Sequence, residues 1–323
     1  MATNVGVGTR AYARYQFENA FGTSIGDSGM TTYFGHNVKF SATPKNNFER
    51  IPGLNNRNYQ KYAAKKFEGS FSADFQLSNA YFLKGIIGSV TSAGTNPTTH
   101  TYAESSICSS ATIQMSEDLD TDNERTLRGC VFDKLTLTMT TGEVVTGKLD
   151  GFYANEIKDA TLNTAGNTAD AEEVMTFAHA SLEYPDGTTI TEIDSLELSI
   201  TNNAEIIYGL GSRLGTQRAF KQREYQVSVT RIREDNTFLN DFYGGPASLA
   251  DPSNTSGAVS LQIVLTNGLA GANQREIQFT LQDIRADDYS MPLNPAEVLK
   301  ESATLFALSG SSVTYKNATT VAP

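Results

Sequence analysis

Polar and apolar residues alternate between positions 67 and 77, in the stretch FEGSFSADFQL. A period of two over this length is typical of a β-strand with one buried and one solvated face. The apolar face comprises Phe67, Gly69, Phe71, Ala73, Phe75 and Leu77, and the polar face Glu68, Ser70, Ser72, Asp74 and Gln76.

The same alternation returns in EYQVSVT, residues 224–230, before Arg231 and Arg233 interrupt it. Its apolar positions are Tyr225, Val227 and Val229, and its polar positions are Glu224, Gln226, Ser228 and Thr230. We therefore expect a second half-buried strand of the same kind.

Another alternating segment precedes each of these strands, VKFSAT at 38–43 and SLELSI at 195–200. The pattern predicts a strand there in each half of the chain. The segments 44–66 and 201–222 would then connect two strands each.

These connecting segments begin with related sequences, NNFERIPGLNNR at 46–57 and NNAEIIYGLGSR at 202–213. Aligned without a gap, residues 46–88 and 202–244 share fourteen identities in forty-three columns, where composition alone gives about three. We interpret the chain as an internal duplication with an offset of 156 residues, which becomes 154 later in each half. A period this long indicates a doubled domain, because solenoid repeats run to roughly 20–50 residues.

Each half also predicts one short helix. In LSNAYFLKGIIG, residues 77–88, the apolar residues have helical spacing, Ser78 or Asn79 can cap the start, and Gly88 can end the helix. In DNTFLNDFYGG, residues 235–245, Asp235 or Asn236 can cap and Gly244 can end the helix.

Further strands are predicted after each helix. In the first half, 132–140 and 143–154 are joined by Thr141-Gly142, which is short enough for a hairpin turn. In the second half, similar strands are expected at 260–268, 276–284 and 297–308.

The predicted fold is mainly β, with two tandem related β-sandwich or barrel units, each with one flanking α-helix. We place the first unit at 1–157, a polar linker at 158–176 and the second unit at 177–323.

Bulk composition narrows the function classes. The 323 residues carry a formal charge of −11 and are 39% apolar, which is enough for real cores. An acidic surface argues against phosphate neutralisation as its main purpose. We find neither an apolar secretion signal at the N-terminus nor an apolar run long enough for a membrane span, so we expect a protein that is made and kept in the cytoplasm, or assembled there.

The sequence offers little catalytic chemistry. His36, His100 and His179 have no ligand or triad spacing, and Cys108 and Cys130 are interpreted as reduced thiols in a β-rich core. No nucleophile elbow, phosphate loop or zinc-protease motif occurs in the sequence. We therefore predict no enzyme activity, no cofactor and no metal.

One acidic stretch has a partial metal-binding pattern. Asp118, Asp120 and Asp122 have the spacing of the first ligands of a calcium loop, but Asn123 and Gly129 stand where Gly and Glu are needed. A solvated acidic loop is favoured over a weak cation site.

Several segments together resemble the tail tube proteins of long-tailed bacterial and archaeal viruses. They are YARYQFENAFGT (12–23), FEGSFSADFQLSNAYFLKGIIGSV (67–90), THTY (99–102), LRGCVFDKLTLTMTTGEVVTGKLDGFYANE (127–156), FAHASLEYPDGTTITEIDSLELSITNNAE (177–205) and EVLKESATLFAL (297–308). Their order and the duplication carry the resemblance, which covers most of the chain.

The resemblance implies a structural virion protein whose protomers form rings, with the inner sheets closing into one barrel around a channel for the genome. A chain with two units would form trimeric, pseudo-hexameric rings, which stack into the tail. Implied partners are other copies of the chain, the tail tip, tail terminator and tape-measure proteins, and genomic DNA passing without specific binding. Assembly would take place in the host cytoplasm.

Under this interpretation the polar strand faces line the channel, where carboxylates and hydroxyls offer phosphate no counter-ion. The predicted lumen-lining residues are Glu68, Ser70, Ser72, Asp74, Gln76, Glu224, Gln226, Ser228 and Thr230. The alternative is that these residues merely face bulk water.

The connecting segments are the candidates for contacts between stacked rings, since they carry cations on an otherwise acidic protein. The predicted ring-stacking residues are Asn46, Asn47, Glu49, Arg57, Asn202, Asn203, Glu205 and Arg213. The alternative function is a β-sandwich decoration protein, adhesin or binding module of a virion or cell surface.

Overall fold

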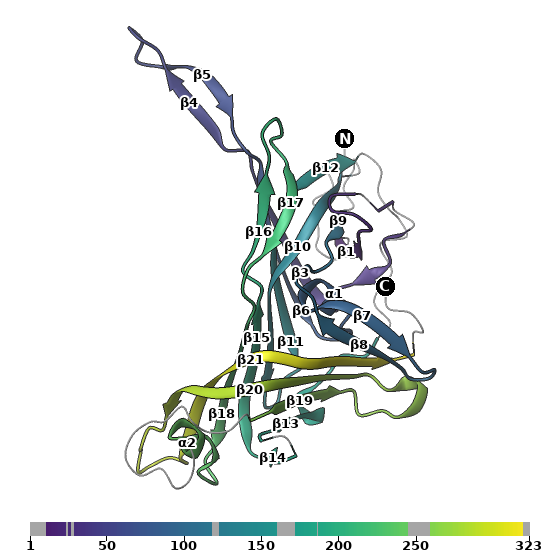
Figure 1. The fold of residues 1–323 in the computed structure, drawn as a ribbon, viewed down its shortest axis with the longest axis vertical. Helices are drawn as coiled ribbons and strands as arrows, with labels where there is room; N and C mark the ends of the chain where they lie inside the picture. Colours follow the sequence, from purple (N-terminus) through teal and green to yellow (C-terminus); the bar gives the residue numbers. More distant parts are fainter. Residues whose placement is uncertain are drawn as a thin grey trace, which may run out of the picture.

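The computed structural model describes residues 11–23, 25–26, 29–117, 123–159, 172–185, 187–244 and 259–318. The fold is mainly β, as predicted (Figure 1). The described part of the chain contains two short α-helices, and no helix in it is both long and apolar enough to cross a membrane.

The strands and helices of the first half run in chain order as far as the predicted linker. They are β1 (Ala11–Phe17), β2 (Thr32–Tyr33), β3 (His36–Lys45), β4 (Phe48–Pro52), β5 (Tyr59–Ala64), β6 (Glu68–Gln76), α1 (Leu83–Ile86), β7 (Gly88–Ala93), β8 (Thr98–Glu104), β9 (Ala111–Glu117), β10 (Asn123–Thr140), β11 (Thr146–Tyr153) and β12 (Asn155–Asp159).

The second half repeats much of this order. It comprises β13 (Ala180–Glu183), β14 (Thr189–Ile190), β15 (Ile193–Thr201), β16 (Ala204–Tyr208), β17 (Gly215–Phe220), β18 (Glu224–Ile232), α2 (Thr237–Phe242), β19 (Leu261–Thr266), β20 (Glu276–Ser290) and β21 (Lys300–Asn317).

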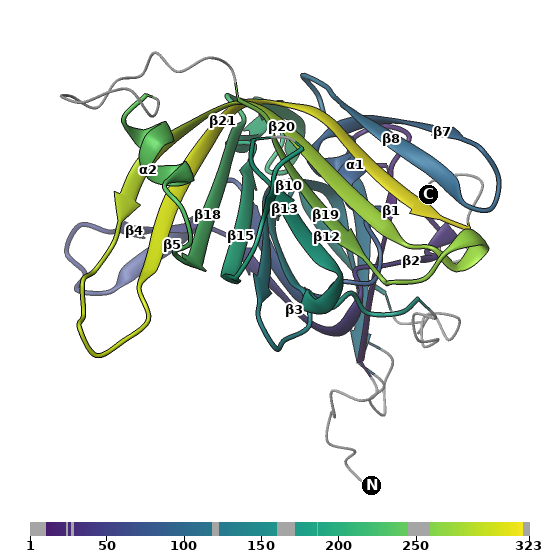
Figure 2. The same cartoon turned by 90° about the horizontal axis from the view of Figure 1, so that it is seen from below.

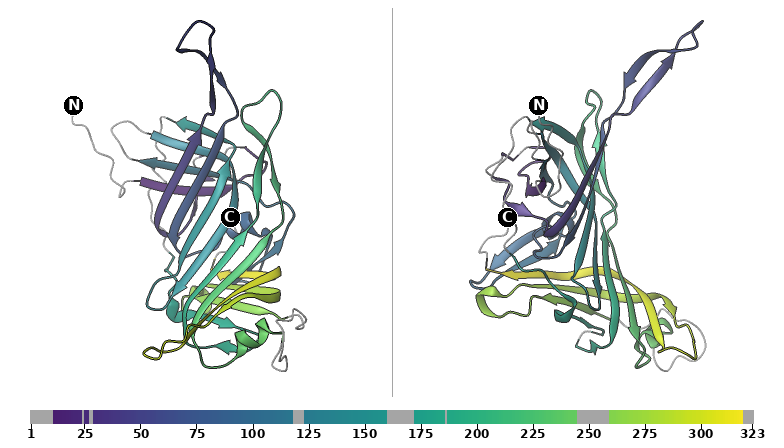
Figure 3. Two further views of the ribbon diagram at one scale, coloured as in Figure 1. Left: turned by 90° about the vertical axis from the view of Figure 1, so that its left-hand side faces the viewer. Right: turned by 180° about the vertical axis from the view of Figure 1, so that it is seen from behind.

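One long antiparallel sheet runs through both halves, in the order β3–β6–β11–β10–β15–β18–β21–β20 (Figure 3). Its centre is the pairing of β10 with β15, which we call the seam. The seam extends from Lys134 opposite Thr201 to Thr140 opposite Ser195. Edge-to-edge pairing thus joins the two halves.

A second layer covers one face of the long sheet. The N-terminal part of β10 bends away to pair with β9 and β12, and β1 and β2 continue that layer. In the second half, β20 likewise leaves the long sheet to pair with β19, which pairs with β13. The halves also meet where β8, paired with β7, lies beside β21.

Strand registers repeat between the halves. Lys45 lies opposite Glu68 in β3–β6, and Thr201 lies opposite Glu224 in β15–β18, each shifted by 156. Phe132 lies opposite Gly151, and 154 residues later Ala286 lies opposite Leu305. A bulge directly follows Phe132 in β10 and Ala286 in β20. The two halves therefore share strand order, register and bulge position.

The core lies between the layers. On the covered face, the strand predicted at 67–77 buries Phe71, Ala73 and Phe75, as its alternation predicts. Phe71 and Phe132 meet edge to face with ring centroids 5.9 Å apart, a favoured aromatic geometry. In the second half Tyr225, Val227 and Val229 are buried in the same way.

Both helices are shorter than predicted. α1 has only four residues and Phe82 at its N-cap, so the prediction of Ser78 or Asn79 as cap was wrong. Both side chains are buried in the segment between β6 and the helix, and Gly88 begins β7. α2 begins after Asn236 as predicted, ends before Gly244, and packs on β20 (Figure 2).

The two connecting segments, expected from sequence as long links between strands, are β-hairpins. β4 pairs with β5 and β16 with β17, each as a separate two-stranded sheet. We call β4–β5 the arm, because it projects far beyond the rest of the protein (Figures 1 and 3). The β16–β17 hairpin lies along the body of the protein instead.

Part of the predicted linker is also ordered structure. β12 continues to Asp159, which lies opposite Glu124 of β10, so strand pairing extends past the boundary predicted at residue 157. The acidic loop with Asp118, Asp120 and Asp122 lies outside the described residues.

Candidate functional site

The uncovered face of the long sheet is the first candidate surface. All nine residues predicted to line a lumen lie on this face, because they alternate with the buried residues of β6 and β18. None of the nine is buried. The predicted alternation is thus confirmed, while the lumen itself stays a prediction.

The neighbouring strands add cations that the sequence interpretation missed. Lys148 on β11 and Lys39 on β3 both lie opposite Asp74, and Lys134 on β10 lies opposite Asp150. Cross-strand neighbours point to the same side of a sheet, so this face carries both signs of charge. The alternation in β3, β10 and β11 already places these lysines in the polar phase, and it could have identified them.

Arg231 is not part of the uncovered face. Its side chain is 1% exposed, and its Nε donates to Oε1 of Glu301 at 2.7 Å. Asp235 accepts a second hydrogen bond at 2.5 Å, and the guanidinium lies over the Phe238 ring. The cation that interrupts the alternation is therefore neutralised within the protomer.

The repeated Asn-Asn sequences form the bases of the two hairpins. Asn47 and Asn203 both adopt a left-handed backbone, with φ of 47° and 48°. Asn47 Nδ2 donates to the Lys66 carbonyl and to Glu68, and Asn203 Nδ2 donates to the Gln222 carbonyl and to Glu224. Asparagine tolerates this conformation better than most residues, so the repeat has a local structural cause.

The repeated glutamates close the same bases. Glu49 pairs with Lys65 and Glu205 with Lys221, both at 2.8 Å. The hydrogen bond from Lys65 holds the pKa of Glu49 below its ordinary value. Both pairs are exposed, and exposed pairs contribute little to stability. Their role in ring stacking stays a prediction.

Arg213 joins the two hairpins. It lies in the turn of β16–β17, and its Nε donates to the Lys65 carbonyl at 2.7 Å, at the base of the arm. Its Nη2 donates to the Asn46 carbonyl at 3.1 Å, and the Arg213 carbonyl accepts the Phe67 N–H at 2.8 Å. The matching residue of the arm, Arg57, lies exposed at the arm's tip.

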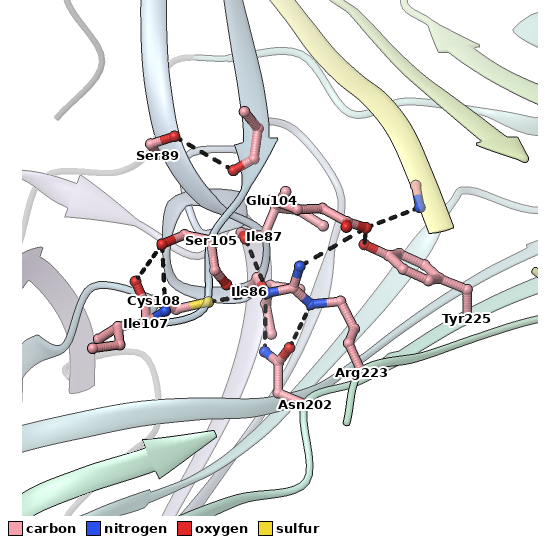
Figure 4. A network of polar contacts seen from close by, with 12 residues as sticks. Ile86, Ile87, Ser89, Glu104, Ser105, Ile107, Cys108, Asn202, Arg223 and Tyr225 are labelled. Carbon is pink, nitrogen blue, oxygen red and sulfur yellow. Dashed lines mark hydrogen bonds and ion pairs between the residues drawn. The ribbon is translucent and has the colours of Figure 1, made fainter. Parts of the chain in front are cut away.

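The seam is closed by a polar cluster from both halves (Figure 4). Asn202 is 1% exposed, and its Nδ2 donates to the carbonyls of Ile86 and Phe132. Arg223 holds the Asn202 side-chain oxygen at 2.8 Å and donates to the Ile87 carbonyl at 3.0 Å. Buried polar groups with partners on both sides fix one register. Asn202 thus serves the seam inside the protomer.

Asp133 completes the seam. Its side chain accepts the Ala204 N–H at 2.6 Å and its carbonyl accepts the Asn202 N–H at 2.8 Å. Burial raises the pKa of Asp133, and the bond from Ala204 partly opposes that rise. Asp133 is the extra residue of the β10 bulge.

The residues considered for catalysis lie apart. His100 is buried between Ser92 and Asn317, while His36 contacts the Glu172 carbonyl. Cys108 and Cys130 are free and buried, and burial raises the pKa of both thiols. Within the described residues, no three His, Cys, Asp or Glu side chains are placed to hold a metal ion.

Comparison with known proteins agrees with this geometry. A family model described as phage tail tube protein matches residues 8–298. No curated protein matches the sequence. Since the matched region covers most of the 323 residues, the chain belongs to the phage tail tube protein family.

Proposed function

We propose that this chain is the tail tube subunit of a long-tailed virus and that three copies close into a ring with pseudo-sixfold symmetry. The observation that carries the proposal is the seam, where two similar halves are already joined into one sheet. In the part of the chain that the structure describes, each end of that sheet is an edge strand, and exposed edges need cover. Closing a ring covers both edges at once.

The pseudo-sixfold symmetry rests on an internal duplication. The common strand order, the registers shifted by 154 or 156 and the matching bulges support that origin. Two units in each of three chains would supply six equivalent positions.

In this ring the uncovered face of the long sheet lines the channel through which the genome passes. Serine and threonine occupy much of it, and its lysines lie beside carboxylates, such as Lys148 at 3.7 Å from Asp150. Cations neutralised in this way are poor phosphate binders, which favours passage of DNA without retention.

The proposed partners are further rings and the tail tip, tail terminator and tape-measure proteins, with assembly in the host cytoplasm. The hairpin surfaces that stay accessible once a ring has closed are the proposed surface for ring stacking. The competing proposal, a decoration or adhesin module, leaves both sheet edges and the projecting arm uncovered.

Negative-stain electron microscopy and mass photometry of the purified protein at increasing concentration test this function. We expect trimeric rings at low concentration and hollow tubes at high concentration. A monomer that forms neither at any concentration would overturn the proposal and favour the decoration module.

The channel assignment has its own test. Replacing Ser70 and Gln226 with lysine adds six cations to each trimeric ring, at positions with no carboxylate directly opposite on the neighbouring strands. We expect these tubes to retain double-stranded DNA fragments at low salt, while wild-type tubes do not. Equal DNA retention by both would exclude these residues from the channel wall.

A further inference from the structure

The two ends of the long sheet are complementary. β3 pairs with β6 on one side, and residues 285–290 of β20 pair with β21 on one side; in the described part of the chain neither pairs with a strand on its other side. β3 corresponds to β15 and this part of β20 corresponds to β10. The ends of the sheet therefore match the two strands that already meet at the seam.

We infer that the contact between two copies of this chain repeats the seam residue for residue, with β20 of one copy paired antiparallel to β3 of the next. The inference rests on the proposed ring and specifies its register. Adding 154 to the residue numbers of β10 and subtracting 156 from those of β15 gives the expected contact. Lys134 opposite Thr201 then corresponds to Asp288 of one copy opposite Lys45 of the next. In the same way, Thr136 opposite Ser199 becomes Ser290 opposite Thr43.

Charge supports this register. Asp288 and Lys45 are both exposed and lie at opposite ends of one protomer's sheet. The transferred register places an acid opposite a base, which is favourable across antiparallel strands. The corresponding pair within the protomer, Lys134 and Thr201, has no such complementarity. The charge pair is therefore specific to the contact between copies.

The bulge supplies a second match. Asp287 occupies the position of Asp133, and Asn46 occupies that of Asn202. Asn202 is 1% exposed inside the seam, whereas Asn46 is exposed. In the contact between copies, Asp287 accepts the N–H of Phe48, and Asn46 donates to main-chain carbonyls of the adjoining copy.

The arm follows the same rule. Within one chain, Arg213 reaches from the turn of β16–β17 to the carbonyls of Lys65 and Asn46. Arg57 corresponds to Arg213. In the contact between copies, Arg57 therefore reaches the carbonyls of Lys221 and Asn202 of the adjoining copy. The arm exposes Phe48, Leu54 and Tyr62 at 57%, 95% and 71%, and such an apolar surface needs a partner. The arm's first partner is thus a copy in the same ring.

Cysteine cross-linking tests the register. The variant Ser290→Cys/Thr43→Cys should cross-link copies into covalent dimers and trimers with a short thiol reagent. Thr136→Cys/Ser199→Cys, at the corresponding positions of the seam, should cross-link within one chain and serves as the positive control. Ser290→Cys/Lys39→Cys is displaced four residues along the strand, about 13 Å, and should give at least tenfold less covalent trimer.

The outcomes separate this inference from the ring itself. Rings or tubes seen by microscopy without a Ser290–Thr43 cross-link, or with more cross-linking at Lys39, would overturn the register and leave the ring standing. Protein that stays monomeric, with only the seam control cross-linked, would overturn both. Covalent trimers confined to the Ser290–Thr43 pair would support the inference.

Discussion

The Oδ1 of Asp133 accepts a hydrogen bond from the backbone N–H of Ala204 across the seam, at 2.6 Å. Asp133→Ala leaves that N–H without this acceptor, at a cost of about 1–3 kcal/mol. Urea unfolding should show this loss in the protomer. Burial raises the pKa of Asp133, so the fold disfavours the ionised form of this side chain. Asp133→Asn keeps a hydrogen-bond acceptor without the charge and should lose less stability than Asp133→Ala.

The corresponding variant Asp287→Ala should behave differently. Its carboxylate is exposed at the end of the sheet, so protomer stability should change little. Ring formation should weaken instead, seen by mass photometry as a higher concentration at half-assembly. A loss of protomer stability equal to that of Asp133→Ala, with assembly unchanged, would contradict the equivalence of these positions.

Arg231→Met tests the buried ion pair. Glu301 has no exposed side-chain surface, and removing its closest cation leaves the carboxylate with only Tyr289 and the more distant Arg233 as partners. Breaking a buried pair in this way costs about 3–5 kcal/mol. The double variant Arg231→Met/Glu301→Met should regain most of that stability, since apolar replacement of a whole buried pair is often neutral.

Arg233→Met is the matched control for that experiment. Arg233 lies 3.8 Å from Glu301 and its side chain is 21% exposed. We expect a much smaller loss in thermal unfolding. Equal losses for the two arginines would show that Arg231 is not the principal partner of Glu301.

Asp235 should give the protein a specific acid sensitivity. The hydrogen bond from Arg231 lowers the pKa of Asp235 from 3.8 to about 2. A lowered carboxylate pKa stabilises the fold above the unfolded value, and this contribution disappears as pH falls through the folded value. Asp235→Asn should therefore be less stable than wild type at pH 7.

The stability difference between Asp235→Asn and wild type should close between about pH 4 and pH 2. Thermal melts across this range measure it. Because the Asp235 side chain is half exposed, solvent screening keeps the effect small. A difference that is constant with pH would assign it to lost packing.

Arg57→Glu should weaken contacts between copies without unfolding the protomer, because Arg57 lies at the exposed tip of the arm. Repulsion from backbone carbonyls should lower the yield of rings and tubes in electron micrographs. Lys61→Glu, an exposed arm residue with the same charge change, is the control. Rings that persist while tubes disappear would place the tip of the arm between stacked rings.

The alternation in β6 and β18 was sufficient to predict both strands and their buried faces, because period two leaves one face for the core. Sequence patterns elsewhere predicted a helix longer than the four residues of α1 and a strand shorter than β10. Helical spacing in 77–88 largely reflects burial of a turn, since Ser78, Asn79 and Ala80 have almost no exposed surface. Tertiary packing there overrides local helix signals.

The repeat of Asn-Asn and Glu at an interval of 156 is read directly from the sequence. Its physical reason is local, since a left-handed asparagine and a short ion pair form each hairpin base. Only the tertiary structure decides that Asn202 is buried while Asn46 is exposed. The two asparagines stand 156 residues apart at matching positions of the two halves. β10 pairs with the second edge of β15 beside Asn202, whereas within the described residues only β6 pairs with β3.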